Sequence, residues 1–415
     1  MNQMGEFTLI KKPEILAPAG DYDKLVAAVQ YGADAVYLGG EEFSMRVACN
    51  NFTDDDLKRG IDFAKENGKK IYIATNVIMK NDDLENVGRF AEKIYSYGAD
   101  AVILSDIGAF DIVKNTVPKL DIHISTQANT NNYASANMWH KLGAARVVLS
   151  REMSYPEVKE LRKKTDKDLE LELFLHGAMC VSYSGRCLLS SFMTGREANR
   201  GACAQPCRWK YYLMEEKRPG EYIQVFEEDN GSYFFNSKDL CLIEFIPELV
   251  DAGVTSFKIE GRVKSEYYVA NTVKAYRHEI DRYYENPDKY VFDPRQLEEL
   301  KKVSHRVYSH GFWHGAPTSD GQVYDSSAYI RDYEVVGVVK ECDDDGNVVV
   351  LQKNKFSVGE TLEVMQPVND TIEFIVDAMQ DEQGNDNETA PHGKMLVKMK
   401  LPQKVDVNSM LRKKK

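Results

Sequence analysis

Short apolar runs alternate with longer amphipathic stretches over the first 262 residues of the chain. One segment occurs four times, twice closely and twice loosely matched: Tyr31–Leu38, Tyr97–Leu104, Leu142–Leu149 and Ala252–Ile259. The copies follow stretches with helical periodicity, such as Asp23–Gln30 and Asn86–Ser96. The glycine at the second position fits a left-handed helix C-cap, and the apolar residues after it fit a buried parallel strand. The pattern therefore predicts a repeated unit of helix, glycine stop and strand.

Four further apolar runs bring the number of predicted strands to eight: Glu14–Ala17, Lys70–Thr75, Asp121–Ser125 and Leu169–Leu175. Strands that alternate with helices indicate a parallel sheet, and eight of them favour a closed (β/α)8 barrel of the TIM type. An open doubly wound sheet is the alternative, but no Gly-x-Gly-x-x-Gly turn follows the first strand. We expect an α/β barrel as the catalytic domain in residues 1–310, with a cysteine-bearing insertion at 177–240.

The hydrophobic pattern changes near Tyr333 to short alternating strands. They are Val335–Val339, Val348–Lys353, Thr361–Val364, Thr371–Val376 and Met395–Lys400. This alternation predicts a small all-β barrel domain in residues 333–415, which follows a linker at 311–332. The terminal Arg412–Lys415 is expected to be a frayed tail, with a phosphate contact as the less favoured alternative.

Composition and charge exclude several classes of protein. Hydrophobic residues make up 43% and charged residues 28% of the 415 residues, which is typical of globular domains. The net charge of −12 argues against indiscriminate nucleic-acid binding, although one local basic face remains compatible with it. The sequence contains neither a signal-peptide pattern nor a run of about 18 apolar residues. We therefore expect a soluble cytoplasmic protein that does not bind membranes.

Five of the seven cysteines lie within 62 residues, at Cys180, Cys187, Cys203, Cys207 and Cys241. An odd number of cysteines in a cytoplasmic chain disfavours a disulfide framework and favours metal or redox chemistry. Zinc sites usually contain pairs separated by two to four residues, and only Cys203 and Cys207 satisfy this spacing. Thiolates also suit iron–sulfur clusters. The spacing predicts a metal site and favours iron–sulfur, with buried unreactive thiols as the alternative.

The segment Glu172–Ser190, ELFLHGAMCVSYSGRCLLS, resembles the signature of peptidase family U32. The flanking segments that resemble the family are Ala17–Gly20, Gly201–Arg208, Asn236–Cys241 and Phe257–Arg262. The family takes its name from a collagenase-like peptidase activity. Several members are instead oxygen-independent hydroxylases, acting on wobble uridine of tRNA with prephenate, on a cytidine of 23S rRNA, or in ubiquinone synthesis.

The resemblance implies a [4Fe–4S] cluster held by Cys180, Cys187, Cys203 and Cys241, with Cys207 as the alternative fourth ligand. A barrel followed by one small β domain is most similar to the tRNA uridine hydroxylase branch. This implies formation of 5-hydroxyuridine, with tRNA and prephenate as partners. Two other functions stay open: a U32 collagenase-like peptidase, and a non-catalytic RNA-binding partner of a U32 paralogue. The sequence has no Gly-x-Ser-x-Gly elbow or His-Glu-x-x-His helix to support a peptidase.

Polar residues near the ends of the predicted strands are candidates for the site. Prephenate has two carboxylates, which calls for arginine or lysine at the barrel mouth. The predicted substrate-binding residues are Arg46, Gln127, Arg151, Lys258 and Arg262, and the predicted catalytic residues are Glu152, His176 and Glu260. Structural ion pairs at the rim are the alternative for the Arg–Glu neighbours, and a satisfied structural histidine is the alternative for His176.

A basic stretch beside the cysteines is the candidate RNA surface. Residues 186–218 contain seven basic and three acidic side chains, 7 − 3 = +4, interleaved with aromatic residues. The predicted RNA-binding residues are Arg200, Arg208, Trp209 and Lys210. Unpaired bases stack on aromatic rings and phosphates pair with arginine, whereas a solvated charged face is the alternative interpretation.

Overall fold

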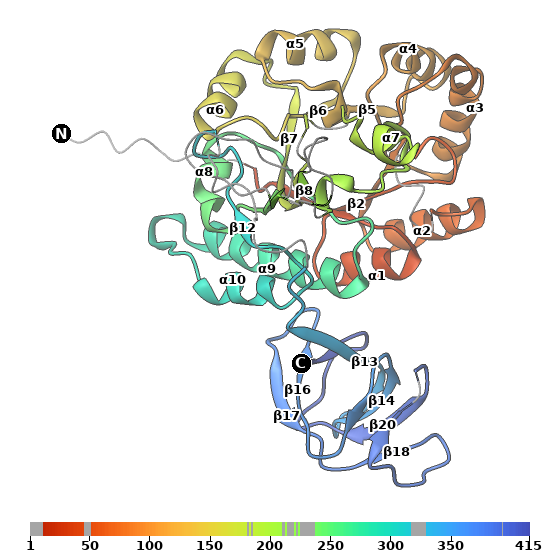
Figure 1. Ribbon diagram of the computed structural model, residues 1–415, viewed down its shortest axis with the longest axis vertical. Coiled ribbons are helices and arrows are strands. Elements are labelled where there is room, and N and C mark those ends of the chain that lie inside the picture. The colour runs from red at the N-terminus through yellow and green to blue at the C-terminus, as the bar shows by residue number, and fades with distance from the viewer. Residues whose placement is uncertain are drawn as a thin grey trace, which may run out of the picture.

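The computed structural model describes residues 11–44, 51–180, 182–183, 186–209, 212–213, 220, 223–224, 237–316, 329–391 and 393–415. An α/β barrel forms the larger body, and a curled β sheet lies against one side of it (Figure 1). None of the helices in these residues has the length and apolar content needed to cross a membrane.

Eight parallel strands close into the predicted barrel. They are β1 (Glu14–Pro18), β2 (Ala35–Leu38), β3 (Lys70–Ala74), β4 (Ala101–Leu104), β5 (Asp121–Ile124), β6 (Arg146–Val148), β7 (Glu170–Ala178) and β11 (Ser256–Ile259). Each pairs with the next, and β11 closes the ring by pairing with both β7 and β1. The TIM-like barrel predicted from the repeats is confirmed.

Helices surround the barrel (Figure 1). They are α1 (Tyr22–Gln30), α2 (Asp54–Glu66), α3 (Asn81–Tyr97), α4 (Ile107–Thr116), α5 (Tyr133–Leu142), α6 (Tyr155–Lys164), α8 (Ile246–Asp251), α9 (Glu266–Glu285) and α10 (Pro294–Lys301). Gly98 and Gly143 cap α3 and α5 in the left-handed conformation, with φ of 96° and 107°. A glycine is favoured at such a cap because it has no Cβ to clash. These two caps confirm the predicted unit of helix, glycine stop and strand.

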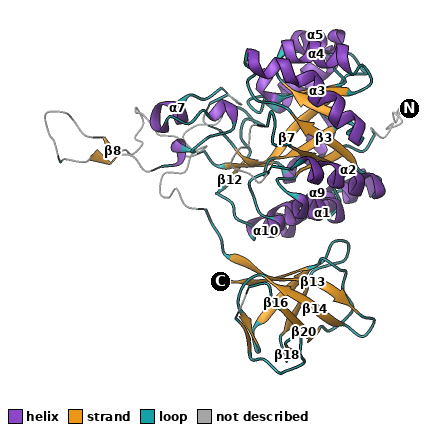
Figure 2. Cartoon of the chain, turned by 90° about the vertical axis from the view of Figure 1, so that its right-hand side faces the viewer, coloured by secondary structure: helices purple, strands orange, loops and turns teal. Residues whose placement is uncertain are grey.

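The insertion extends the sheet beyond β7 and projects from one end of the barrel (Figure 2). Strand β10 (Asp239–Cys241) runs antiparallel to the last residues of β7, and β12 (Tyr308–Ser309) pairs with β10. The other described elements are α7 (Leu189–Thr194), the short 3-10 helices η2 (Ala198–Arg200) and η3 (Pro206–Arg208), and the paired strands β8 (Tyr212–Leu213) and β9 (Ile223–Gln224). The insertion therefore begins at the carboxyl end of a barrel strand.

The C-terminal domain is a curled antiparallel sheet. Its order is β17 (Ile372–Ile375), β16 (Thr361–Met365), β21 (Met410–Lys414), β13 (Tyr333–Cys342), β14 (Asn347–Gln352), β20 (Leu396–Lys400) and β18 (Met379–Gln380). Strands β15 (Phe356–Ser357) and β19 (Thr389–Ala390) form a separate pair. The predicted all-β domain is confirmed as a half-barrel, because among the described residues the end strands β17 and β18 do not pair.

The expectation of a frayed C-terminal tail is wrong, because Arg412 is a buried anchor between the two domains. Strand β21 places its guanidinium against α9 and α10, where Nη1 donates to Asn271 Oδ1 at 3.0 Å. Nη2 lies 2.6 Å from carboxylate oxygens of both Glu299 and Glu363. Tyr31, the C-cap residue that follows α1, also donates to the carbonyl of Met365 at 3.0 Å. These contacts fix the half-barrel on the helical side of the barrel.

Candidate functional site

A cavity of about 140 Å³ lies at the barrel mouth, where the insertion leaves β7. TIM barrels carry their chemistry at this end. The predicted site residues on its wall are Gln127, Arg151, Cys180, Cys187, Cys203, Lys258, Glu260 and Arg262. The structure therefore gathers residues from several strand ends and from the insertion around one space.

Lys258 lies on β11 with its ammonium buried against the barrel interior. Its Nζ is 2.7 Å from Glu172 Oε1 and 4.5 Å from the centre of the Tyr37 ring. Burial acts to raise the pKa of Glu172, but the charges of Lys258 and Arg146 outweigh it and lower that pKa. Glu172 therefore stays ionised and fixes the lysine on the cavity wall.

Arg262 follows β11, and its side chain is held by Ser44 and Asn51, which lie between β2 and α2 in the sequence. Its Nη2 donates to Ser44 Oγ and to Asn51 Oδ1, each at 2.9 Å. A Cβ at Gly39 would collide with this guanidinium, and a Cβ at Gly20 would collide with the Arg262 carbonyl oxygen. Glycine is needed at both positions because the arginine and its backbone pass so close to them.

Arg151 and Gln127 occupy other parts of the wall. Arg151 Nη1 donates to the carbonyl of Ala178 at 2.9 Å, and its guanidinium carbon lies 5.3 Å from the centre of the Phe174 ring. Gln127 belongs to the 3-10 helix η1 (Thr126–Ala128), and its Oε1 accepts from Ser125 Oγ at 3.2 Å. Both side chains are thus positioned by the ends of neighbouring strands.

Glu260 is the one carboxylate among the described residues of the wall. The backbone N–H of Glu260 donates to the His176 carbonyl at 2.9 Å, and the Glu260 carbonyl accepts from Tyr268 Oη at 3.0 Å. Gly177, at φ 111°, lies against it, and a Cβ there would clash with the Glu260 backbone. Two hydrogen bonds and a glycine contact therefore place this acid beside three basic side chains.

Three thiols share the same wall. Cys180 and Cys203 are exposed and Cys187 is half-buried, and the backbone N–H of Gln205 donates to Cys203 Sγ at 3.4 Å. Among the described residues, no three of their sulfurs lie within 4.8 Å of one another, as a single bound ion would require. A cluster of several irons is larger and takes soft thiolate ligands from further apart. The described thiols are therefore not gathered around the position of one zinc ion, and as soft ligands they have the chemistry that an iron–sulfur cluster takes.

The two candidates for a fourth ligand lie off this wall. Cys241 is buried in β10, with its Sγ 3.8 Å from Tyr276 Oη, and burial raises the pKa of the thiol to about 12. It lines a separate cavity beside His305 and His310. Cys207 is half-buried in η3, four residues after Cys203. The fourth position is therefore not fixed by this geometry.

His176 lies apart from the predicted site residues of the cavity wall. Strand β7 continues to Ala178, so His176 lies within the strand and not in the loop after it. The rings of Tyr268, Tyr276 and Tyr308 surround it at centre distances of 5.9, 5.6 and 5.3 Å. Burial, with smaller contributions from Lys264 and His305, lowers its pKa to about 3. It is therefore neutral at physiological pH and lies off the cavity wall, and its catalytic role stays a prediction that this position disfavours.

Glu152 and Arg200 each have a partner inside the chain. Glu152 accepts a hydrogen bond from Ser150 Oγ and does not belong to the wall. Arg200 Nη1 lies 2.7 Å from Asp83 Oδ2 and 2.8 Å from the Ile78 carbonyl oxygen, so it fastens the insertion to the start of α3. Trp209 is exposed, as an RNA contact requires. Arg46, Lys210 and the side chain of Arg208 lie outside the described residues.

Several residues of the site were not predicted from the sequence. Ser44 and Asn51 hold Arg262, Glu172 holds Lys258, and Tyr183 lines the cavity. Glu172 had a detectable signal, since it and Glu170 are two acids inside a predicted strand whose other residues are apolar. Ser44 and Asn51 had none, because their partner lies more than two hundred residues later in the chain.

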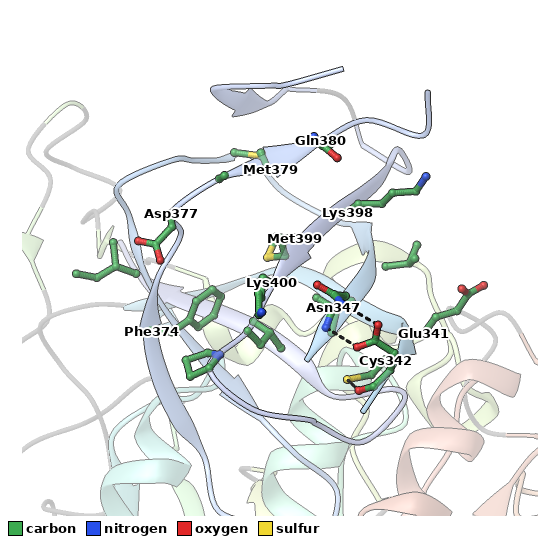
Figure 3. A pocket seen from close by; sticks show the side chains of 17 residues that line it. Glu341, Cys342, Asn347, Phe374, Asp377, Met379, Gln380, Lys398, Met399 and Lys400 are labelled. Carbon is green, nitrogen blue, oxygen red and sulfur yellow. Dashed lines mark hydrogen bonds between the residues drawn. The ribbon is translucent and has the colours of Figure 1, made fainter. Parts of the chain in front are cut away.

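A third hollow, of about 1110 Å³, lies in the half-barrel. Figure 3 shows charged and apolar side chains around it, including Asp377, Lys398, Lys400, Phe374 and Met399. Its one described cysteine is Cys342, and acids and bases are mixed along its wall. Because it lacks the convergent cysteines and arginines of the barrel mouth, we place the candidate site in the barrel.

Comparison with known proteins matches residues 20–322 to peptidase family U32 and residues 331–412 to the C-terminal domain of that family. The tRNA hydroxylation protein P1 of Bacillus subtilis is 38% identical and covers 99% of this chain and 96% of that relative. The tRNA hydroxylation protein P of Escherichia coli is 37% identical over 96% of each chain. A collagenase of Porphyromonas gingivalis is 33% identical over 73% of this chain and 72% of that relative.

Proposed function

The chain belongs to peptidase family U32, and on that premise we propose that it is an enzyme that hydroxylates tRNA. The proposed product is 5-hydroxyuridine at the wobble position, formed without oxygen and with prephenate as the hydroxyl source. One observation carries the proposal: a protein named for tRNA hydroxylation aligns with 99% of this chain, the half-barrel included.

The cysteines of the barrel mouth would hold a [4Fe–4S] cluster. Cys180, Cys187 and Cys203 supply three ligands from one wall, and Cys241 or Cys207 supplies the fourth. When bound, such a cluster supplies one-electron redox chemistry at the site. The basic side chains of the wall supply positive charge, and they line the same space as the cluster ligands.

Arg151 and Arg262 would bind the two carboxylates of prephenate. Lys258 is paired with Glu172, and Arg151 and Arg262 lie on the same wall as Glu260. Arginine suits carboxylates because its planar fork donates two parallel hydrogen bonds. Gln127 adds an amide to the same wall, and Glu260 is positioned to accept or return a proton.

A U32 peptidase is the second candidate, and the collagenase relative is the observation that favours it. Proteolysis through a thiol requires a base within hydrogen-bonding reach of the sulfur. His176 is the histidine nearest in sequence to Cys180, but its ring packs among three tyrosine rings. Its pKa of about 3 also makes it a weak base for a thiol. The described residues therefore favour hydroxylation over a Cys180–His176 dyad.

The proposal is tested by restoring the gene in cells that lack it and measuring 5-hydroxyuridine in tRNA together with iron and sulfide in the purified protein. Arg262→Ala should abolish the modification with iron retained, whereas Cys180→Ser should remove both. Separate Cys207→Ser and Cys241→Ser variants identify the fourth ligand by their iron content.

A metal-free wild-type protein that cleaves collagen would overturn the proposal in favour of a peptidase. Activity of the isolated wild-type protein would exclude the role of a non-catalytic partner of a paralogue.

A further inference from the structure

The insertion concentrates exposed apolar side chains at the barrel mouth. Three of the five exposed aromatic residues in the described chain lie there, Tyr183, Phe192 and Trp209, together with exposed Leu188 and Met193. Phe192 on α7 is 82% exposed, and it is the one exposed phenylalanine of the described residues. Large side chains gathered in this way usually mark a binding surface, whereas single exposed residues do not.

The same elements are joined directly to the cavity that holds the cysteines. Tyr183 belongs both to the exposed set and to the cavity wall. On the inner side of α7, buried Ser190 accepts a hydrogen bond from the backbone N–H of Ala204 at 3.0 Å, next to Cys203. Figure 2 shows α7 standing away from the barrel on the side of the insertion. The apolar surface is therefore held beside the cavity.

The charge of this segment is opposite to that of the whole chain. Residues 182–209 contain four arginines and one acid, 4 − 1 = +3, in a protein of net charge −12. Arg186 and Arg196 are exposed, and the single acid, Glu197, lies 3.5 Å from Lys80. A surface that combines rings with arginines suits a polyanion that has flat apolar groups, and it suits a purely apolar protein partner less well.

We infer that Tyr183, Leu188, Phe192, Met193 and Trp209, with Arg186 and Arg196, form a stacking surface for unpaired nucleobases. The inference rests on the proposed function and deepens it, because it assigns the occupant as a single-stranded loop of the substrate RNA. Paired bases are hidden inside an A-form helix, whereas unpaired bases stack on rings while arginines contact their phosphates. A base that enters the cavity must leave its stack, and its neighbours then need a substitute surface.

The test measures binding of the full-length, cluster-containing protein to an RNA hairpin with an anticodon-type loop and to a blunt duplex of the same stem. Three variants separate stacking from other apolar contact: Phe192→Ala, Phe192→Leu, which stays apolar but loses the ring, and Phe192→Tyr, which keeps the ring. Val368→Ala is the matched control, because Val368 is also 82% exposed but lies in the C-terminal domain. Both side chains, Phe192 and Val368, are on the surface, so the four variants should fold like wild type.

We expect the Ala and Leu variants to weaken hairpin binding about tenfold, with the Tyr variant and Val368→Ala within about twofold of wild type. Wild-type binding to the duplex should be weaker than to the hairpin.

Three results would overturn the inference: hairpin binding by Phe192→Leu equal to that of wild type, equal wild-type affinity for duplex and hairpin, or no hairpin binding by wild type. A dimer that Phe192→Ala dissociates, with RNA binding unchanged, would assign the surface to a second copy of the chain. Wild-type protein that binds the hairpin but restores no 5-hydroxyuridine in cells would contradict the proposed function alone.

Discussion

Lys258 and Glu172 form an ion pair of 2.7 Å inside the barrel, with both side chains buried. The other carboxylate oxygen of Glu172 lies 3.0 Å from Arg146 Nη1, which also contacts Glu14 at 2.6 Å. The lysine on the cavity wall is thus the outermost member of a charge network that continues into the barrel. Its position depends on acids that never reach the cavity.

Glu172→Gln should lower the free energy of unfolding by about 3–5 kcal/mol, because it leaves the buried Lys258 without its carboxylate and removes one of the carboxylates around Arg146. The loss is measured from urea unfolding followed by circular dichroism. The double variant Glu172→Leu with Lys258→Met removes both charges and should recover part of the stability. A single-variant loss below about 1 kcal/mol would contradict the assigned network.

Arg412→Ala should release the C-terminal domain from the barrel, because Glu299 and Glu363 lose the buried guanidinium that joins them and keep only the partly exposed Lys302 among their described cations. Removing one partner of a buried ion pair costs about 3–5 kcal/mol. Small-angle scattering should show a longer particle, and limited proteolysis should cut between the domains. Arg295→Ala is the control, since Arg295 is an exposed arginine paired only with Asp293. An unchanged scattering profile for Arg412→Ala would exclude this anchoring role.

The domain contact should also weaken in acid. Burial acts to raise the pKa of Glu299, but Arg412 and Lys302 outweigh it, so the folded pKa lies below the ordinary value. A carboxylate of this kind stabilises the fold at pH above its unfolded pKa, about 4.3, and loses that contribution as the pH falls through the folded value. Melting temperature should therefore fall below about pH 4.3, and Glu299→Gln should reduce the slope there. The same slope in the variant would contradict this assignment.

Gly39→Ala should lower tRNA hydroxylation with little loss of iron, because the new Cβ displaces the Arg262 guanidinium and Ser44 Oγ. Misplacing a substrate-binding group by about 1 Å costs up to about a hundredfold in rate. The rate is measured by nucleoside analysis of unmodified tRNA incubated with the protein. Gly393→Ala, which has no close contact, should behave like wild type. Wild-type rates for Gly39→Ala would remove Arg262 from the proposed site.

The fold was predictable because its signals are local. The four repeats and four apolar runs predicted all eight barrel strands, since a buried parallel strand is read directly from a short apolar run. The end of β7 was not predictable, because Gly177 and Ala178 extend the strand through pairing with β10, more than sixty residues later. Arg412 was taken for part of a tail because its partners, Glu299 and Asn271, belong to another domain.

The site was predictable where residues follow strand ends and not where long-range contacts decide. Arg151, Lys258, Glu260 and Arg262 meet on one wall because barrel strands end at the same mouth. Arg200 was taken for an RNA contact since its partner, Asp83, lies 117 residues earlier. Basic residues in a sequence do not reveal which of them already have a carboxylate in the fold.

Hydroxylation of tRNA is the central claim, and mass spectrometry of tRNA nucleosides tests it most directly. The comparison uses cells with the gene, cells without it and cells restored with wild type or Arg262→Ala, in a strain that has no U32 paralogue. We predict that 5-hydroxyuridine and its derivatives disappear on deletion, return with wild type and do not return with Arg262→Ala. An unchanged nucleoside profile on deletion would contradict the claim.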